Sequence, residues 1–396
     1  MFEPSQSLVN PGFVDPLERR DSGVLKWNRY PDGVIPAWVA EHDLGPPPAV
    51  VTRLHELVDM RAFGYHTSAD DVGPAFSHWT TQRHGWTPDP ELILPTANVL
   101  QGIWACVEAL TGPGDGIVYS PPVYPPFLDV APTTNRRAVH WPMMRTKEGW
   151  RYNLDALGEL LEADPGIGLL LLCHPHNPTG CVLTAKELER IVELAHVHDL
   201  TIVSDEIHSD LVYEGSTHIP MLTVPGAPSH TVTVTSGVKT FALGGMLCAV
   251  AVCGDERLHS AIRSIPVELL GVPNRMGCEA SITAWETGSG WADNLLDLLS
   301  RNRRTLFDRI RAELPQVGMF LPESTFVAWL DLSEFKTGDH PARWLRHMTG
   351  IAGGNGPNFG PGGEKHVRIT FGTSAELLDE ITDRIITGLK GQEETA

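Results

Sequence analysis

Two charged side chains are expected at the edge of a buried sheet, where they could do chemistry on a small molecule. Lys239 follows the apolar run TVTVT, and Asp205 follows the run TIVS. Open α/β sheets bind ligands at the carboxyl ends of their strands. A desolvated lysine amine near another cation has a lowered pKa and can attack an aldehyde. Lys239 is therefore a candidate for covalent chemistry on a bound aldehyde.

A third charged residue, Arg368, lies in the strand-like run HVRITF, where it alternates with apolar neighbours. We expect it to project from one face of a strand, and its planar fork suits bidentate binding of a carboxylate. Each of the three residues also has a structural alternative. Lys239 could be a surface lysine in a loop, Asp205 a helix cap, and Arg368 a partner in a salt bridge.

These residues need a scaffold, and short apolar runs alternate with amphipathic stretches between about residues 50 and 285. This pattern is typical of helices that cover a mostly parallel sheet. The clearest helix spans Thr184 to His198, where Thr184 and Glu187 form the pattern of a capping box. The expected buried strands are residues 116–119, 168–173, 201–204, 231–235 and 248–253.

The C-terminal part has a different pattern, because TFVAWLDL and HVRITFG read as antiparallel strands followed by a terminal helix over residues 375–389. This indicates a second, smaller α+β domain. A long helix is expected over residues 295–314, with its arginines on the solvated side. These arginines are Arg301, Arg303, Arg304, Arg309 and Arg311.

Composition excludes several classes of function. The net charge of -19 would repel nucleic acids and anionic lipid headgroups, so we expect neither as a partner. The start of the chain, MFEPSQSLVNPGF, shows no signal-peptide pattern, and the longest apolar run is too short to span a bilayer. The six cysteines form no CxxC pair, which favours reduced core thiols, no metal site and a cytoplasmic protein.

Four runs in this order resemble the signature of pyridoxal-phosphate (PLP) enzymes of the fold type I aminotransferase superfamily. They are HNPTG at 176–180, SDEIH at 204–208, TSGVK at 235–239 and HVRITF at 366–371. The resemblance implies an α/β protein with a mostly parallel seven-stranded sheet between helices and a smaller α+β domain. The large PLP-binding domain would comprise residues 46–285, and the small domain residues 1–45 and 286–396.

The resemblance also assigns roles to residues around the cofactor ring. Lys239 would form the Schiff base, and Asp205 would keep the ring nitrogen protonated. Asn177 would bind the phenolic oxygen and lie near the substrate carboxylate, aimed inward by a cis bond before Pro178. Tyr124 would stack on the ring. Arg368 would orient an amino-acid substrate. Taken alone, NPTG is also compatible with an ordinary turn, and Tyr124 with a core aromatic residue.

The phosphate and the second subunit complete the expected site. Ser236 resembles the family's phosphate ligand, and the backbone amides of Ala97 and Asn98 would add a helix N-terminus. Tyr65, in FGYHT, resembles the tyrosine that reaches the phosphate of the neighbouring subunit's site. The resemblance therefore implies a homodimer.

One substitution points to a branch of the superfamily. His208 stands where many aminotransferases carry a tyrosine, and Leu247 stands where they carry a phosphate-binding arginine. Both features resemble the MalY/PatB-type cystathionine β-lyases, a carbon-sulfur (C-S) lyase branch, although a lone histidine is more often structural. Further runs that match are LKWNRY at 25–30, PAWVAEHDL at 36–44, FGYHT at 63–67 and PVYPPF at 122–127.

The chain departs from this branch at the site's margins, with AEHD at 40–43 for ADMD, SGVK for SxSK and Ala97-Asn98 for Gly-Val. We interpret these changes as signs of a specialised substrate or reaction outcome, rather than of a housekeeping cystathionine enzyme. The leading hypothesis is β-elimination from an S-substituted L-cysteine, cystathionine-like or a specialised-metabolite conjugate, to thiol, pyruvate and ammonia. The thiol substituent stays open.

Other functions remain as alternatives. One is an aminotransferase or a decarboxylation-coupled oxidative deaminase that acts on a cysteine S-conjugate, as in sulfur-antibiotic biosynthesis. Another is a cofactor-binding regulator without catalysis, against which Lys239, Asp205, Asn177 and Arg368 argue. A nicotinamide-dependent oxidoreductase is disfavoured, because no expected strand is followed by GxGxxG.

Overall fold

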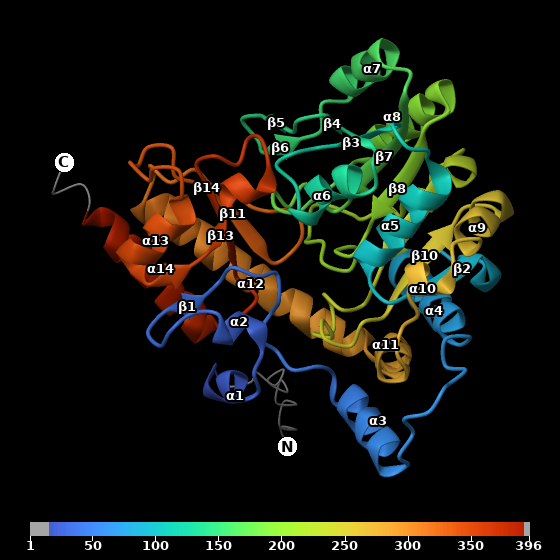
Figure 1. The fold of residues 1–396 in the computed structure, drawn as a ribbon. Helices are drawn as coiled ribbons and strands as arrows, with labels where there is room; N and C mark the ends of the chain where they lie inside the picture. The colour runs from blue at the N-terminus through green and yellow to red at the C-terminus, as the bar shows by residue number, and fades with distance from the viewer. Residues whose placement is uncertain (1–15, 392–396) are drawn as a thin grey trace, which may run out of the picture.

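The centre of the protein is a seven-stranded sheet between layers of helices, as seen in a computed structural model that describes residues 16–391 (Figure 1). In spatial order the strands are β2 (Ile93–Thr96), β10 (Ala249–Cys253), β9 (Thr231–Thr235), β8 (Thr201–Asp205), β7 (Ile167–Cys173), β3 (Gly116–Tyr119) and β4 (Arg137–His140). β10 alone runs in the direction opposite to the other six strands. The prediction of a mostly parallel seven-stranded sheet is confirmed.

The five strands expected from apolar runs are all present. β3 and β9 have the predicted bounds, and the other three differ by one residue at one end. Every residue of β9 and β10 is buried, as expected for strands covered on both faces. The sequence analysis did not predict β2 and β4; three of the four residues of β4 are exposed, so the strand lacks the apolar signal.

Helices cover both faces of this sheet (Figure 1). Successive residues of β7 point to opposite faces, so Leu170 packs in one apolar cluster and Leu171 in another. The capping box at Thr184 and Glu187 is formed as expected. The helices of this region are α3 (Pro48–Asp59), α4 (Val72–His84), α5 (Val99–Leu110), α6 (Pro126–Thr133), α7 (Leu154–Ala163), α8 (Ala185–His198), α9 (Glu256–Arg263), α10 (Val267–Leu270) and α11 (Arg275–Thr287).

A second body contains a three-stranded antiparallel sheet in the order β11 (Val327–Asp331), β14 (His366–Thr370) and β13 (Gly354–Asn355). Its helices are α12 (Ser289–Glu313), α13 (Pro341–Thr349) and α14 (Ala375–Lys390). The antiparallel pairing of β11 with β14 and the terminal helix confirm the expected α+β character of this part.

The N-terminal segment packs with this second body. It contains α1 (Pro16–Asp21), α2 (Leu25–Asn28) and β1 (Ile35–Pro36), and β1 pairs in parallel with β12 (Ile351–Ala352). The helix α12 joins the two bodies, because Ala292 packs against the large one and Leu295 against the small one. The predicted division at residues 45 and 285 is compatible with this packing and stays a prediction; residues 1–15 and 392–396 of the small domain lie outside the described part.

The expectation for the arginines of the long helix is wrong at one position. Arg303 is buried rather than solvated, and it donates to the Pro322 carbonyl oxygen at 2.6 Å. Its guanidinium also lies 4.0 Å from the ring centroid of Tyr213. Helical periodicity identifies a face but not how far the next segment covers it, so the sequence pattern did not show this burial.

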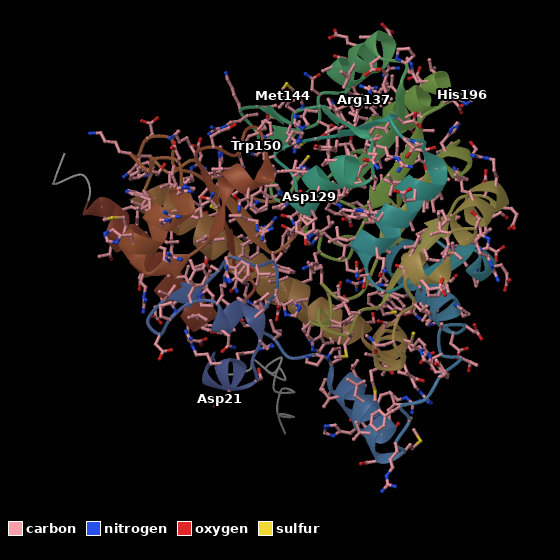
Figure 2. All side chains as sticks on the ribbon, viewed as in Figure 1. Asp21, Asp129, Arg137, Met144, Trp150 and His196 are labelled. Atoms are coloured by element: carbon pink, nitrogen blue, oxygen red, sulfur yellow. The ribbon has the colours of Figure 1, made fainter. Side chains whose placement is uncertain are left out.

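A short hairpin crosses from the large body to the small one. It consists of β5 (Met144–Arg145) and β6 (Trp150–Arg151), and Figure 2 labels Met144 and Trp150 beside the small body. Arg145 forms an ion pair with Asp331 of β11 at 2.5 Å.

Within residues 16–391, no helix combines the length and apolar character that a membrane span requires.

Candidate active site

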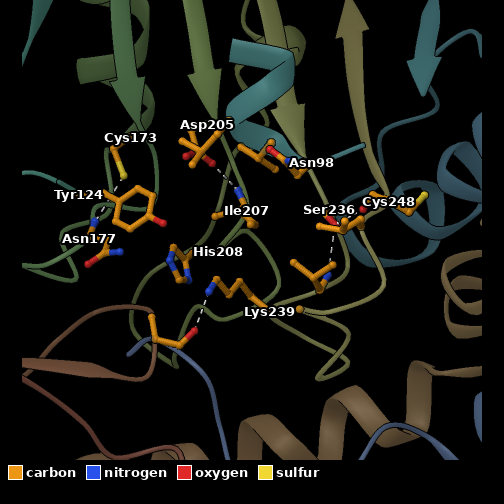
Figure 3. Close-up of a pocket in the computed structure, with 16 residues that line it drawn as sticks. Asn98, Tyr124, Cys173, Asn177, Asp205, Ile207, His208, Ser236, Lys239 and Cys248 are labelled. Carbon is orange, nitrogen blue, oxygen red and sulfur yellow. Dashed lines mark hydrogen bonds between the residues drawn. The ribbon is translucent and has the colours of Figure 1, made fainter. Parts of the chain in front are cut away.

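The predicted chemical residues converge at one edge of the large sheet. Neighbouring parallel strands β3, β7, β8 and β9 lead at their carboxyl ends to Tyr124, Asn177, Asp205 and Lys239 respectively. These four side chains line one cavity of about 260 Å³ (Figure 3). The converging strand ends form the kind of crevice in which open α/β sheets bind ligands.

The Lys239 amine is poised for nucleophilic or base chemistry. Its Nζ atom donates to the carbonyl oxygen of Ala40 at 2.6 Å, a bond drawn in Figure 3. Burial is the main cause that lowers the pKa of Lys239 to about 8, and the cation of Arg368 lowers it further. Lys239 lines the cavity and bonds a carbonyl oxygen of a distant segment, so the alternative of a surface lysine is wrong.

Asp205 is the last residue of β8, and its carboxylate points into the same cavity (Figure 3). Its Oδ1 atom accepts from the Ile207 amide at 3.1 Å. Burial raises the pKa of Asp205 to about 7, although Lys239 opposes the rise. No helix begins after it, so the helix-cap alternative is wrong. A cation placed beside this carboxylate would restore its charge.

Arg368 and Asn177 form the contact between β14 and the loop that follows β7. Arg368 Nη1 donates to Asn177 Oδ1 at 2.9 Å, and Nη2 donates to the Trp38 carbonyl oxygen at 2.8 Å. The Asn177–Pro178 bond is cis, as expected. Arg368 is 5% exposed and pairs with no acidic side chain among the described residues, so the salt-bridge alternative is not supported.

His208 lies next to Lys239 in the cavity (Figure 3). Burial lowers the pKa of His208 to about 3, and Lys239 and Arg368 add to the effect, so the ring is neutral at ordinary pH. Its buried Nδ1 atom has no hydrogen-bond partner in the described part of the chain. A buried polar atom without a partner is costly, so a ligand atom is its natural complement.

The N-terminus of α5, which lines part of the cavity, could bind an anion. Asn98 caps α5, and its Oδ1 atom accepts from the Gln101 amide at 2.9 Å. The first amides of a helix are free to bind a phosphate. The cavity is lined there by Asn98, Val99 and Leu100 but not by Ala97, and the role of the Ala97 and Asn98 amides toward a phosphate stays a prediction.

Two other expectations for the phosphate end concern Ser236 and Tyr65. Ser236 lines the cavity, and its hydroxyl donates to the Cys248 carbonyl oxygen at 2.5 Å. Tyr65 is fully exposed and does not line the cavity of its own chain. Its predicted role toward a neighbouring subunit's site stays a prediction.

Several lining residues were missed by the sequence analysis. They are Ala40, Val99, Leu100, Cys173, Ile207, Val238, Gly244 and Cys248. Most contribute backbone or apolar surface, for which residue type gives no chemical signal. Ala40 belongs to the run PAWVAEHDL at 36–44, and its only signal in the sequence was the resemblance of that run to the lyase branch.

The arrangement fits a flat aldehyde cofactor that carries a phosphate. The amine of Lys239, the carboxylate of Asp205, the unpartnered Nδ1 atom of His208 and the helix N-terminus at Asn98 lie around a single cavity. Among the described residues, no group of three or more His, Cys, Asp or Glu side chains is arranged to hold a metal ion.

The fold and the site indicate the class of this protein, and comparison with known proteins shows the family to which it belongs. The sequence pattern of the aminotransferase class I and II family matches residues 25–385, and the chain belongs to this family. It is 32% identical to cystathionine beta-lyase PatB of Bacillus subtilis, over 94% of this chain and 98% of PatB. It is 31% identical to a cystathionine beta-lyase of Corynebacterium glutamicum, over 95% of this chain and 100% of that protein.

Comparison with solved structures supports the same family assignment. The crystal structure of cystalysin from Treponema denticola, which contains pyridoxal 5'-phosphate, has a TM-score of 0.90 and 26% identity. The match covers 96% of this chain and 99% of cystalysin. The fold type and the lyase branch that the motifs indicated are therefore confirmed.

Proposed function

We propose that this protein is a PLP-dependent C-S lyase that carries out β-elimination on an S-substituted L-cysteine. With one water consumed, the products are a thiol, pyruvate and ammonia. The observation that carries the proposal is the single cavity in which Lys239, Asp205, His208 and Asn177 meet. The lyases among its relatives and structural neighbours support the same assignment.

Each residue then has a task. When bound, PLP supplies an electron sink for the charge left on the substrate Cα. Lys239 takes the proton from Cα, and because burial lowers its pKa to about 8, more of its amine is free near neutral pH than for an exposed lysine. Asp205 would hold a proton on the cofactor's ring nitrogen, and Asn98, Ser236 and the start of α5 would bind its phosphate.

Arg368 and His208 act on position rather than on bond breaking. The Arg368 fork would bind the substrate α-carboxylate, and its bond to Asn177 fixes the guanidinium plane. Neutral His208 can donate one ring N–H to an oxygen of the cofactor. Tyr124, which also lines the cavity, would cover the cofactor ring.

The test is product balance with S-alkyl-L-cysteines. Free thiol and pyruvate should appear in equal amounts, and Lys239→Ala should abolish both. Carbon dioxide without thiol, or a keto acid that retains the sulfur, would assign the alternative outcome of decarboxylation-coupled deamination or transamination.

The proposal includes a homodimer in the cytoplasm. A second copy would cover the apolar side chains that are exposed in α3, in α10 and in the segments just after these helices. They are Val58, Met60, Phe63, Tyr65, Val267, Leu269 and Val272. Tyr65 would then reach the neighbouring site. All six cysteines are unpaired and buried, which is compatible with a reducing compartment.

Mixed dimers test the placement of Tyr65. A dimer of one Lys239→Ala subunit and one Tyr65→Phe subunit has one intact site only if Tyr65 serves the partner. We therefore expect activity to return when the two inactive or weakened variants are mixed and re-associated. If the mixture stays at the level of its components, Tyr65 acts in its own subunit or not at all.

A further inference from the structure

A second, larger cavity lies beside the first. Its volume is about 690 Å³, and the two cavities share the side chain of Tyr124. Arg368 lines the second cavity while its Nη1 atom bonds Asn177, which lines the first. The two spaces are therefore adjacent, with Tyr124 lining both and Arg368 of the second cavity bonded to Asn177 of the first.

The second cavity is strongly cationic. Arg29, Arg343, Arg346 and Arg368 line it, and no aspartate or glutamate does. None of these four arginines forms an ion pair with a described acidic residue, whereas eleven of the other nineteen arginines in residues 16–391 do. In a chain with a net charge of -19, a cavity of this kind is a local exception.

The positions of these arginines are set by the small body. Arg343 and Arg346 are three residues apart on α13 and so share a face of that helix. The guanidinium of Arg346 lies 4.9 Å from the ring centroid of Tyr30, which follows Arg29 in the chain. Asn355 and Asn358 add neutral polar groups to the same wall.

Unpaired guanidinium groups around one cavity repel one another, and an anion relieves this repulsion. Carboxylates fit the arginine fork best, because two parallel N–H bonds can form. A ligand with an ammonium group would find no acidic partner on the described wall. The charge of the wall therefore selects for negative ligands that carry no additional cation.

We propose that this second cavity binds the substituent of the substrate and that the substituent carries a carboxylate. The inference rests on the proposed lyase function and names its substrate class, S-(carboxyalkyl) conjugates of L-cysteine. Arg368 takes the α-carboxylate, and Arg29, Arg343 and Arg346 take the distal one. Cystathionine, whose distal end also carries an ammonium group, is a poorer fit than a plain carboxyalkyl conjugate.

A matched pair of substrates tests the charge. S-(2-carboxyethyl)-L-cysteine and its carboxamide have the same shape and differ only in the distal charge. We expect kcat/KM to favour the acid by about tenfold or more, and the preference to shrink as salt is added. Equal kcat/KM values for the two would overturn the proposal.

Variants locate the preference. The double variant Arg343→Gln, Arg346→Gln should lose most of the discrimination between acid and amide while it retains cleavage of the amide. Arg304→Gln removes the same kind of charge from an exposed position on α12 and should leave the preference unchanged. An unchanged preference in the double variant would contradict the assignment to this cavity.

Binding without turnover separates this proposal from the lyase function. Calorimetric titration of the holoenzyme should show tighter binding of glutarate than of glutaramate, which keeps one carboxylate for Arg368 and neutralises the other. If that difference holds and depends on Arg343 and Arg346 but no cysteine conjugate is cleaved, the cavity proposal stands and the lyase proposal fails. If cleavage occurs and glutarate has no advantage, the reverse is true.

Discussion

The guanidinium of Arg368 is joined to the side chain of Asn177 by a 2.9 Å hydrogen bond, although the two residues are 191 positions apart. The bond connects β14 of the small body to the loop after β7 of the large sheet. It fixes the plane of a group that has no acidic partner among the described residues. If Arg368 binds the substrate carboxylate as proposed, the orientation of the substrate depends on how the two bodies pack.

Arg368→Lys should therefore damage substrate binding although the charge is kept. A lysine cannot make two parallel bonds to a carboxylate, so we expect KM to rise by about 10- to 100-fold with a smaller change in kcat. Steady-state kinetics on one S-alkyl cysteine will measure the split. Arg304→Lys serves as the matched control, and equal kinetics for both variants would refute the role of the fork.

Lys239 and His208 should differ sharply in importance. Lys239→Ala removes the proton acceptor, and positioned proton transfer alone supplies about 10²- to 10⁴-fold in rate. His208→Gln keeps an N–H donor and should cost about tenfold at most. Both are measured by thiol release in the holoenzyme. A larger loss from His208→Gln than from Lys239→Ala would show that the base has been misassigned.

The covalent capture of PLP by the cofactor-free protein should follow the ionisation of Lys239. Burial and Arg368 lower the pKa of this amine to about 8, so the rate of capture should rise with pH and level off above about pH 8. Arg368→Gln removes a neighbouring cation, which raises the pKa of Lys239 and moves the profile to higher pH. Borohydride trapping followed by peptide mapping measures the extent; no shift would contradict the coupling.

Asp205 should make the cofactor-free protein less stable as the pH rises. Its pKa is raised to about 7 in the folded state, so the folded protein holds a proton that the unfolded chain releases near pH 4. Stability is therefore lost between about pH 4 and pH 7. Compared with Asp205→Asn, the wild type should have a falling thermal midpoint over this range, and bound PLP should reduce the difference. Parallel midpoints for both proteins would rule out this linkage.

The buried Arg303 gives a test of stability away from the site. Arg303→Met removes the bond to the Pro322 carbonyl and the contact with the Tyr213 ring, so we expect a loss of about 1 to 3 kcal/mol in the free energy of unfolding. The adjacent exposed Arg304→Met should change it by about 0.5 kcal/mol or less. Denaturant unfolding of both variants measures the difference, and similar values would show that burial of Arg303 contributes nothing.

Much of the large sheet could be predicted because its strands are buried on both faces and read as unbroken apolar runs. β9 was predicted with its observed bounds, whereas the exposed edge strand β4 has no such run and was missed. Lys239 and Asp205 could be placed because both follow such runs. Arg303 could not be placed correctly, since its burial depends on Pro322 and Tyr213 from other segments.

The second cavity, which is lined by four arginines, gave no signal in the sequence because its residues also come from distant segments. Arg29 and Arg343 come from segments more than 300 positions apart, and each looks like an ordinary surface residue in its own segment. Only the packing of the N-terminal segment against α13 brings them to one wall. Local patterns report which residues could react, but not which distant residues select the substrate.

The oxygen that accepts from Lys239 belongs to Ala40, in the segment that pairs with β12 and that Asp43 anchors to Lys26 at 2.8 Å. The reactive amine is thus held from outside the sheet that carries it. A fragment beginning after this segment would keep all seven strands of the large sheet and still leave that amine without its anchor. Residues 26–43 would therefore contribute directly to the proposed active site, although they lie outside the large sheet.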